Sequence, residues 1–329
     1  MVVVNWNRKE LLRACLRSLA CQQGVPFETI VVDNGSSDGS ADMAEREFSA
    51  RVVRNLENRG FCAANNQGIA ASAGEFIALL NNDAEAEPGW LEALYTACAR
   101  HPRTGMAASK IVVWEDPQRI DKVGHLMYPD GQNRGRGSGA LDRGQYDREE
   151  EALWPDGCAC LYRRAMLDQI GGFDEDFFAY GDDAELGLRA RIAGWTCVYT
   201  PRAVVRHHRG STLGKNSAHR LTLIERNRVL LALKLFPWSL LWLNPVFFAA
   251  RIAAGIWASL RGSGDTTYFP GISGKLRMAG ALLRGDCQAL LLAPRMLRKR
   301  RQIARLRRLS ASDVRRLILR HRLPLREAA

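Results

Sequence analysis

The stretch Phe76-Ile-Ala-Leu-Leu80 is followed directly by Asn81, Asn82 and Asp83. A short apolar run that stops at polar side chains is typical of a buried parallel strand. Ligands bind at the carboxyl ends of such strands in open α/β sheets, so Asp83 stands where a hard cation or a phosphate could be met. Taken alone the stretch favours an ordinary turn, because Asn and Asp are common turn residues.

The first 113 residues repeat this pattern and change the interpretation. Apolar strands are expected at 2–6, 29–32, 76–80 and 106–113, with amphipathic helices between them. This alternation predicts an α/β fold whose mostly parallel sheet carries helices on both faces. Polar turns follow three of the strands, and parallel strands share one edge, so together they indicate a site. These turns are Asn5-Trp6-Asn7, Asp33-Asn34 and Asn81-Asn82-Asp83.

The middle of the chain supplies further candidates. Residues 114–152 are rich in Gly, Asp and Arg and weakly periodic, which predicts a long, variable loop over the site. Asp182 and Asp183 open a predicted helix, where carboxylates also serve as ordinary capping groups. A later strand ends at Arg206-His207-His208. Adjacent side chains on a strand point to opposite faces, so at most one of the two histidines can face a shared site.

The C-terminal region is apolar and then basic. Residues 230–260 are long enough to span a bilayer, but Pro237, Asn244-Pro245, Lys234 and Arg251 interrupt them. We expect membrane contact rather than a soluble helical hairpin, and the sequence leaves spanning and interfacial helices open. Much of the net charge of +12 lies in the tail at 295–329, which suits an anionic membrane surface or nucleic acid.

The eight cysteines form no CxxC pair and no regular framework. This scatter indicates a reducing compartment and thiols that serve in packing.

With these residues in place, the chain resembles family 2 glycosyltransferases of the GT-A fold, and within them a bacterial, rhamnosyltransferase-like subgroup. The resemblance covers residues 1–225, taken as the GT-A domain, and extends loosely to the helical region at 226–329. Each motif is weak alone, but their order is specific. The matching pieces are 4–7, 31–38, 58–61 with Asn65-Asn66, 79–83, 171–178, 181–186 and 205–208.

The resemblance implies roles for individual residues. Asp33 would hydrogen-bond the nucleotide base, Asp83 and His207 would hold Mg²⁺ or Mn²⁺, and Asp183 would be the catalytic base. Two positions depart from the family pattern: Asn81 replaces the first acid of the metal motif, and Asp182 replaces a glutamate. The wider nucleotide- and donor-binding set is Asn5, Trp6, Asn7, Asp33, Asn34, Asn58, Arg59, Gly60, Asn65, Asn81, Asn82 and Asp83, and the sugar and acceptor set is Trp90, Asp156, Gly157 and Asp182.

The sequence therefore predicts an inverting glycosyltransferase that uses a nucleotide-sugar donor. The resemblance favours dTDP-rhamnose as donor and a lipid-linked or growing polysaccharide as acceptor. We expect it at the cytoplasmic face of the cell membrane, held there by its C-terminal region and without nucleic acid as partner. Two alternatives are a sugar nucleotidyltransferase of similar fold, which would need a Gly-rich triphosphate loop near the first strand, and a basic nucleic-acid-binding protein.

Overall fold

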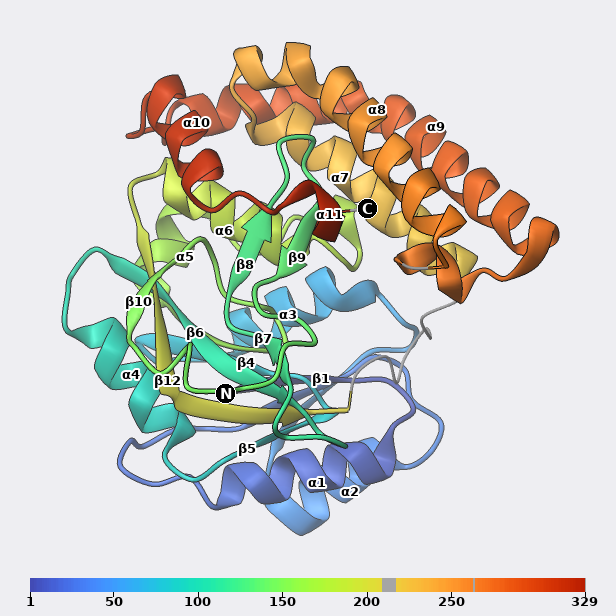
Figure 1. Cartoon of the computed structure of the whole chain (residues 1–329). Coiled ribbons are helices and arrows are strands. Elements are labelled where there is room, and N and C mark those ends of the chain that lie inside the picture. Colours follow the sequence, from blue (N-terminus) through green and yellow to red (C-terminus); the bar gives the residue numbers. More distant parts are fainter. Residues whose placement is uncertain (209–216, 263, 329) are drawn as a thin grey trace. The chain divides into compact units, whose positions relative to one another are not determined.

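The computed structural model describes residues 1–208, 217–262 and 264–328 (Figure 1). The chain forms two compact units. The first, here called the sheet unit, comprises residues 1–125 and 135–209, and the second, the helical unit, comprises 126–134 and 210–329. Residue 225, the boundary expected from the sequence, falls inside helix α7 (Ala218–Leu235).

The N-terminal half of the sheet is parallel. Its strands lie in the order β4-β1-β2-β3, and Asn5 at the end of β1 is paired with Asp33 at the end of β2. Two of the predicted polar turns therefore meet at one edge, as expected for parallel strands. The bounds are β1 (Val2–Asn5), β2 (Ile30–Asp33), β3 (Arg51–Arg54) and β4 (Phe76–Leu80).

The other half of the sheet is mixed. Strand β11 lies between β4 and β6 and is antiparallel to both, whereas β12 is parallel to β6. The later strand expected to end at Arg206-His207-His208 is β12, which has an irregularity between Tyr199 and Val204. The bounds are β5 (Ala84–Ala86), β6 (Thr104–Val113), β11 (Ala159–Arg163) and β12 (Thr196–His207).

Helices cover both faces of this sheet (Figure 1). On β1, Val3 joins the core with Leu12 and Leu16 of α1, while Val2 packs on Gly68 of α3, because alternate residues of a strand point to opposite faces. The helices are α1 (Lys9–Ala20), α2 (Ser40–Phe48), α3 (Gly60–Ala71), α4 (Trp90–Ala99), α5 (Arg164–Ile170) and α6 (Asp182–Ile192).

The segment 114–152 is more ordered than the long loop predicted from the sequence. It contains four short strands, of which β7 pairs with β6 and β10 pairs with β12. Residues with a low periodicity signal can still form strands when an existing sheet edge offers them partners. The strands are β7 (Ile120–Lys122), β8 (His125–Met127), β9 (Asn133–Gly135) and β10 (Glu150–Ala152).

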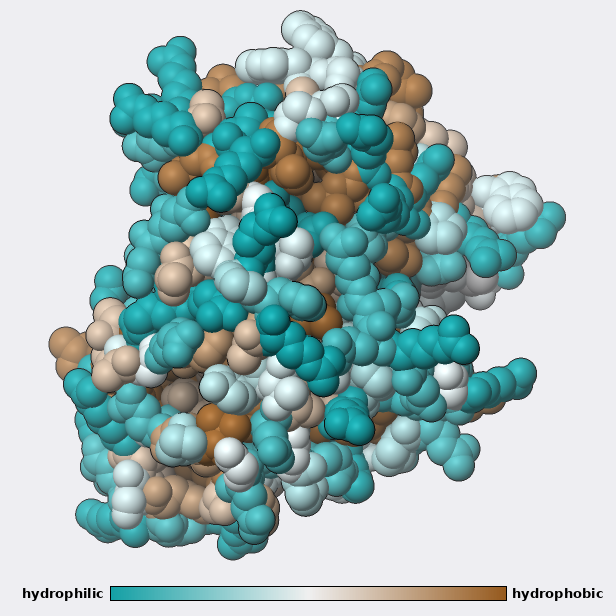
Figure 2. All heavy atoms as spheres, turned by 90° about the vertical axis from the view of Figure 1, so that its left-hand side faces the viewer, coloured by the Kyte–Doolittle hydropathy of each residue, from teal (hydrophilic) through white to brown (hydrophobic). Residues whose placement is uncertain are grey.

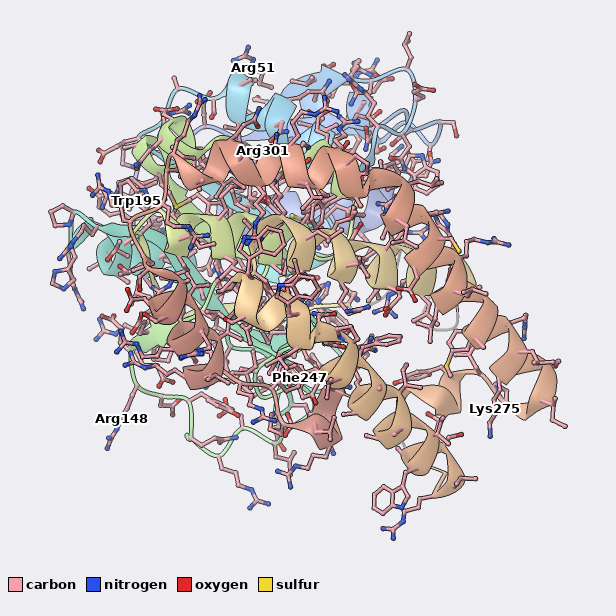
Figure 3. All side chains as sticks on the ribbon, turned by 90° about the horizontal axis from the view of Figure 1, so that it is seen from above. Arg51, Arg148, Trp195, Phe247, Lys275 and Arg301 are labelled. Atoms are coloured by element: carbon pink, nitrogen blue, oxygen red, sulfur yellow. The ribbon has the colours of Figure 1, made fainter. Side chains whose placement is uncertain are left out.

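The helical unit is built around the packing of α9 on α7. Ala281 and Gly285 of α9 face α7, and the Thr222 hydroxyl donates to the Ala281 carbonyl at 3.1 Å. Pro237 precedes α8, but Pro245 lies inside it, so the expected break at Asn244-Pro245 is not formed. Figure 3 shows Phe247 on α8, and Lys275 and Arg301 toward opposite ends of α9. The bounds are α7 (Ala218–Leu235), α8 (Trp238–Leu260), α9 (Gly271–Ala304), α10 (Ala311–Arg320) and α11 (Leu325–Ala328).

Candidate active site

The ends of β1, β2 and β4 are joined by a buried polar network. The Asn5 amide donates to the Ser40 hydroxyl at 2.8 Å, and its carbonyl oxygen accepts from the Asn82 amide at 2.7 Å. Asp33 is buried, and its Oδ2 accepts from the backbone N–H of Ser36 at 3.0 Å. The structure therefore brings together the three turns that the sequence singled out.

A second group extends this edge. The Asn34 amide donates to Asn58 Oδ1 at 3.0 Å, and Asn34 Oδ1 accepts from the backbone N–H of Arg59 at 3.1 Å. Gly60 has a positive φ of 84°, and a Cβ there would lie 2.4 Å from the Phe178 ring. Only glycine satisfies both conditions, which fixes how α3 begins beside the strand ends.

The β1 turn itself lies at the surface. Trp6 is 39% exposed, and Asn7 has a positive φ of 51° with its Oδ1 accepting from the backbone N–H of Ser37 at 2.8 Å. Trp6 directly follows Asn5, the residue paired with Asp33, so the half-exposed indole lies at the same edge. This arrangement suits a planar ring system such as a nucleobase.

Asp83 and His207, which the family resemblance implies as metal ligands, lie together. His207 Nε2 lies 3.4 Å from Asp83 Oδ1, and His207 Nδ1 lies 2.7 Å from Asp121 Oδ2. His208 instead stacks on Trp114, with ring centroids 4.4 Å apart, and faces Glu85. A carboxylate and an imidazole, the latter oriented by a second carboxylate, are the donor types of a divalent-cation site.

A third group surrounds Asp156. The Lys122 ammonium lies 2.6 Å from Asp156 Oδ2, and His125 Nε2 lies 2.8 Å from the same oxygen. His125 Nε2 is also 3.4 Å from Asp183 Oδ2. Ligand atoms of His125, Asp156 and Asp183 all lie within 4.8 Å of one another, which is close enough to hold a metal ion. However, Lys122 already supplies a positive charge at Asp156, so a second cation there would be repelled.

Asp183 is held at the first turn of α6. It is buried, and its Oδ2 accepts from the backbone N–H of Gly157 at 3.4 Å. Burial raises the pKa of Asp183 above its ordinary value, although His125 and Lys122 oppose the increase. Burial, and then the adjacent Asp183, raise the pKa of Asp182 well above the ordinary value. A carboxylate with a raised pKa is a better proton acceptor, as general-base catalysis requires.

Asp156 has the opposite character. Burial alone would raise its pKa, but the Lys122 ammonium and His125 hold the pKa of Asp156 well below the ordinary value. Neighbouring carboxylates with pKa values pushed apart are a common feature of catalytic sites. In this pair Asp156 stays ionised, whereas Asp183 is placed to exchange a proton.

The loop before α6 is strained. Phe178 and Tyr180 have positive φ angles of 63° and 67°, in a region that residues other than glycine rarely adopt. The Phe178 carbonyl accepts from the backbone N–H of Cys62 at 3.1 Å, which anchors the loop to α3. Backbone strain of this kind concentrates at functional sites, and here it immediately precedes Asp182 and Asp183.

One predicted residue, Trp90, lies elsewhere. Trp90 is fully buried in the hydrophobic core, where its indole N–H donates to the Ser109 hydroxyl at 2.8 Å, so the expectation that it contacts a sugar is wrong. Asn65 donates to the carbonyl of Phe61 in its own helix, one turn earlier. Asn81 donates its backbone N–H to the Cys158 carbonyl at 2.7 Å, and this bond joins β4 to β11 beyond the last ladder pair.

Asp121, Lys122 and His125 were not predicted as site residues from the sequence. All three come from the segment that was expected to be an irregular loop, and β7 directs Asp121 to His207 and Lys122 to Asp156. The local signal was weak, because Ile120-Asp-Lys-Val-Gly-His125 holds only two apolar side chains and shows no strict alternation.

Comparison with known proteins identifies the class. The model of Glycosyl transferase family 2 matches residues 1–171. The chain belongs to this family and is a glycosyltransferase of the rhamnosyltransferase-like subgroup, as predicted. This membership favours the glycosyltransferase prediction over both alternatives, a nucleotidyltransferase and a nucleic-acid-binding protein.

Individual relatives are consistent with this assignment. An N-acetylglucosaminyl-diphospho-decaprenol L-rhamnosyltransferase of Mycobacterium tuberculosis is 30% identical over 243 residues, which are 67% of this chain and 79% of that protein. The O-antigen biosynthesis protein RfbC of Myxococcus xanthus is 28% identical over 216 residues, covering 63% of this chain and 17% of that protein.

Solved structures confirm the GT-A fold. GalNAc-T7, solved with UDP, GalNAc and Mn²⁺, has a TM-score of 0.61 at 16% identity and covers 76% of this chain and 49% of its own. The mannosyltransferase PcManGT of Pyrobaculum calidifontis, solved with GDP-Man and Mn²⁺, has a TM-score of 0.53 at 17% identity and covers 88% and 86%.

Proposed function

We propose that this glycosyltransferase transfers a sugar from a nucleotide-sugar donor, with dTDP-rhamnose favoured, to a lipid-linked or growing polysaccharide acceptor with inversion. The observation that carries the proposal is the arrangement of two distinct acidic positions in the sheet unit. Asp83 with His207 forms a cation-binding edge, and Asp183 forms a buried, proton-accepting position beside Asp156. The rhamnosyltransferase of Mycobacterium tuberculosis supports the choice of donor and acceptor class.

The donor lies along the strand ends in this proposal. Asp33, Asn34 and the Asn5-Trp6-Asn7 turn take the nucleoside, with Asn58, Arg59 and Gly60 beside them. Asn82 stiffens the edge through its bond to Asn5. These side chains supply hydrogen bonds and one aromatic face, which is what recognition of a base and a ribose requires.

The diphosphate then reaches Asp83 and His207, which would hold Mg²⁺ or Mn²⁺. The ion, when bound, offsets the charge that develops on the leaving diphosphate. Asn81 offers a neutral amide oxygen where the family pattern has an acid, so Asp83, His207 and the diphosphate oxygens would hold the ion. His207 is oriented for this by Asp121.

Asp183 removes the proton from the acceptor hydroxyl as that oxygen attacks the sugar carbon. The bond from this carbon to the diphosphate oxygen breaks in the same step, so one in-line displacement inverts the anomeric centre. Lys122 and His125 hold the pKa of Asp156 well below its ordinary value, which makes Asp156 a weaker proton acceptor than Asp183. Asp182 and Gly157 border the space for sugar and acceptor. Gly157 carries no side chain where it approaches Asp183, which leaves that space open.

The membrane location rests on the helical unit. Helix α8 is long and apolar enough to cross a membrane by length and composition, and the basic tail follows. We place the enzyme at the cytoplasmic face of the membrane, where a lipid-linked acceptor is found.

The experiment is a donor panel with the purified full chain. Release of nucleoside diphosphate is measured for dTDP-, UDP- and GDP-sugars with a polyprenyl-diphosphate-linked acceptor, in Mn²⁺, Mg²⁺ or EDTA. We expect acceptor-dependent turnover with dTDP-rhamnose that EDTA abolishes. Turnover with a UDP- or GDP-sugar alone would overturn the donor assignment, and full turnover in EDTA would overturn the metal assignment.

A further inference from the structure

Helix α8 has one exposed face that is almost wholly apolar. The exposed positions recur every three or four residues, so they form a single stripe along all of α8. Trp242 and Leu260 are each 80% exposed, near opposite ends of the helix. The stripe therefore runs the full length of the 23-residue helix. Its members are Trp238, Trp242, Leu243, Pro245, Val246, Ala249, Ala253, Ile256, Trp257 and Leu260, with Ser239 as the one polar exception.

The opposite face of α8 carries a buried charge. Arg251 lies near the middle of the helix, and its Nε donates to Asp130 Oδ2 at 2.6 Å. Its terminal nitrogen donates to Glu225 Oε2 of α7 at 3.1 Å. Arg228 also pairs with Glu225, and its guanidinium donates to the Asp130 carbonyl at 2.9 Å. Asn244 of α8 donates to the same carbonyl at 2.8 Å.

This network prevents α8 from crossing a bilayer. If α8 spanned, Arg251 would sit near the middle of the hydrocarbon core. Either Asp130 and Glu225 would enter the hydrocarbon with it, or the pairs would break and leave buried charges uncompensated. Both are strongly unfavourable, whereas a helix lying along the surface keeps the network inside the helical unit.

We infer that α8 lies in the plane of the membrane interface, with its apolar stripe inserted among the acyl chains and Arg251 facing inward into the helical unit. This inference rests on the proposed function and specifies how the enzyme contacts the membrane. Interfacial helices combine an apolar face with aromatic anchors and basic flanks, and Trp238, Trp242 and Trp257 supply such anchors. Arg261 lies over the Trp257 ring at 3.7 Å, which places a cation beside one of them.

Helix α9 carries a second exposed apolar stripe, and its basic border indicates which lipid the helical unit binds. Its face away from α7 exposes Ile272, Leu276, Leu283 and Leu290, again at helical spacing. At 100° per residue, basic side chains lie between about a quarter and about two-fifths of a turn to one side of this stripe, along its border. An apolar stripe bordered by cations matches a bilayer that contains anionic phospholipid. The border residues are Arg277, Arg284 and Arg295, all exposed.

The first test measures binding of the purified full chain to vesicles by flotation. We expect the protein to float with phosphatidylcholine vesicles that contain phosphatidylglycerol, and to be released by high salt or carbonate. Trp242→Glu and Leu276→Glu should each reduce the bound fraction at least about ten-fold. Leu56→Glu is the matched control, because Leu56 is fully exposed in the sheet unit, and it should bind normally. Absence of flotation, or equal loss in the control, would overturn the inference.

Two native cysteines report the contact directly. Cys287 lies on the apolar stripe of α9, and Cys21 lies in the sheet unit; both are exposed. Vesicles should protect Cys287 from a membrane-impermeant maleimide and leave Cys21 reactive. Equal reactivity of Cys287 with and without vesicles would contradict the proposed orientation.

Topology in cells separates an interfacial helix from a spanning one. In a Cys287→Ser background, Arg315→Cys marks α10, which follows α8, and Cys21 marks the sheet unit. We expect both thiols in spheroplasts to react only after permeabilisation. Reaction of the Arg315→Cys thiol alone in intact spheroplasts, together with resistance to carbonate, would show that α8 spans and would overturn the inference.

These outcomes are independent of the chemistry. A protein that fails to bind vesicles but transfers sugar to a short, soluble acceptor would refute the interfacial helix and leave the proposed function intact. A protein that binds vesicles but never transfers sugar would refute the proposed function and leave the interfacial helix intact.

Discussion

His207 stands between two carboxylates: its Nδ1 lies 2.7 Å from Asp121 Oδ2, and its Nε2 lies 3.4 Å from Asp83 Oδ1. Metal-binding histidines commonly present one ring nitrogen to the ion while the other is held by a carboxylate. The fixed ring makes Asp121 a positioning residue for the proposed cation.

Asp121→Asn should weaken Mn²⁺ binding about ten- to a hundred-fold, because loss of the carboxylate lowers the basicity of the imidazole. An electron paramagnetic resonance titration of Mn²⁺ with nucleoside diphosphate measures this affinity. Asp116→Asn, at a half-exposed aspartate of the same segment, is the control. Unchanged Mn²⁺ affinity in the Asp121 variant would remove the positioning role.

The two adjacent histidines should differ sharply. In a thermal-shift assay, His207→Ala should abolish the extra stabilisation that Mn²⁺ gives in the presence of a nucleoside diphosphate. His208→Ala should preserve it, since His208 stacks on Trp114 and faces Glu85 instead of Asp83. The reverse pattern would transfer the ligand role to His208.

The packing of α9 on α7 gives a paired test of stability. A Cβ on Gly285 would lie 2.8 Å from the Thr222 carbonyl oxygen, so Gly285→Ala forces the helices apart and should cost about 1–3 kcal/mol. A Cβ on Gly280 of the same helix meets nothing within 4 Å. Gly280→Ala should therefore be neutral or stabilise by up to about 1 kcal/mol. Denaturant unfolding measures both, and equal effects would contradict the described contact.

Asp286 should make stability depend on pH. Burial, and then the neighbouring Glu225, raise its pKa from 3.8 to about 6. A raised carboxyl pKa opposes folding once the unfolded chain ionises, so this penalty is absent below pH 3.8, grows between 3.8 and about 6, and is complete above. Asp286→Asn should thus raise stability at pH 7.5 by about 1 kcal/mol, after discounting for its partial exposure.

Melting temperatures of wild type and Asp286→Asn at pH 7.5 and near pH 4 check this expectation. The difference should be present at the higher pH and vanish at the lower one. A difference of the same size at both values would mean that the charge of Asp286 is not its cause.

The sequence predicted the parallel half of the sheet and the strand-end site because each depends on local pattern. Apolar runs ending at Asn5, Asp33 and Asn81 place polar groups at one edge whatever the rest of the chain does. By contrast, Trp90 follows the strand-end motif closely in sequence, but its large apolar side chain is buried in the core. Proximity in sequence did not distinguish these outcomes.

The environment of Asp183 could not be predicted in the same way. Lys122 and His125 reach Asp156 only because β7 adds to the edge of β6, a tertiary pairing without a strong local signal. The inward face of α8 was hidden for a similar reason. In the sequence Arg251 only interrupts an apolar segment. Its partners Asp130 and Glu225 are distant in sequence, so the local pattern does not predict them.

Turnover and donor binding, measured side by side for Asp183→Asn, test whether Asp183 takes the proton from the acceptor. We predict that kcat falls at least about a hundred-fold, as expected for loss of a general base. The Kd of the nucleoside diphosphate in Mn²⁺ should remain unchanged, because Asp83 and His207 are intact. Turnover at the wild-type rate in Asp183→Asn would contradict the role of Asp183 as the general base.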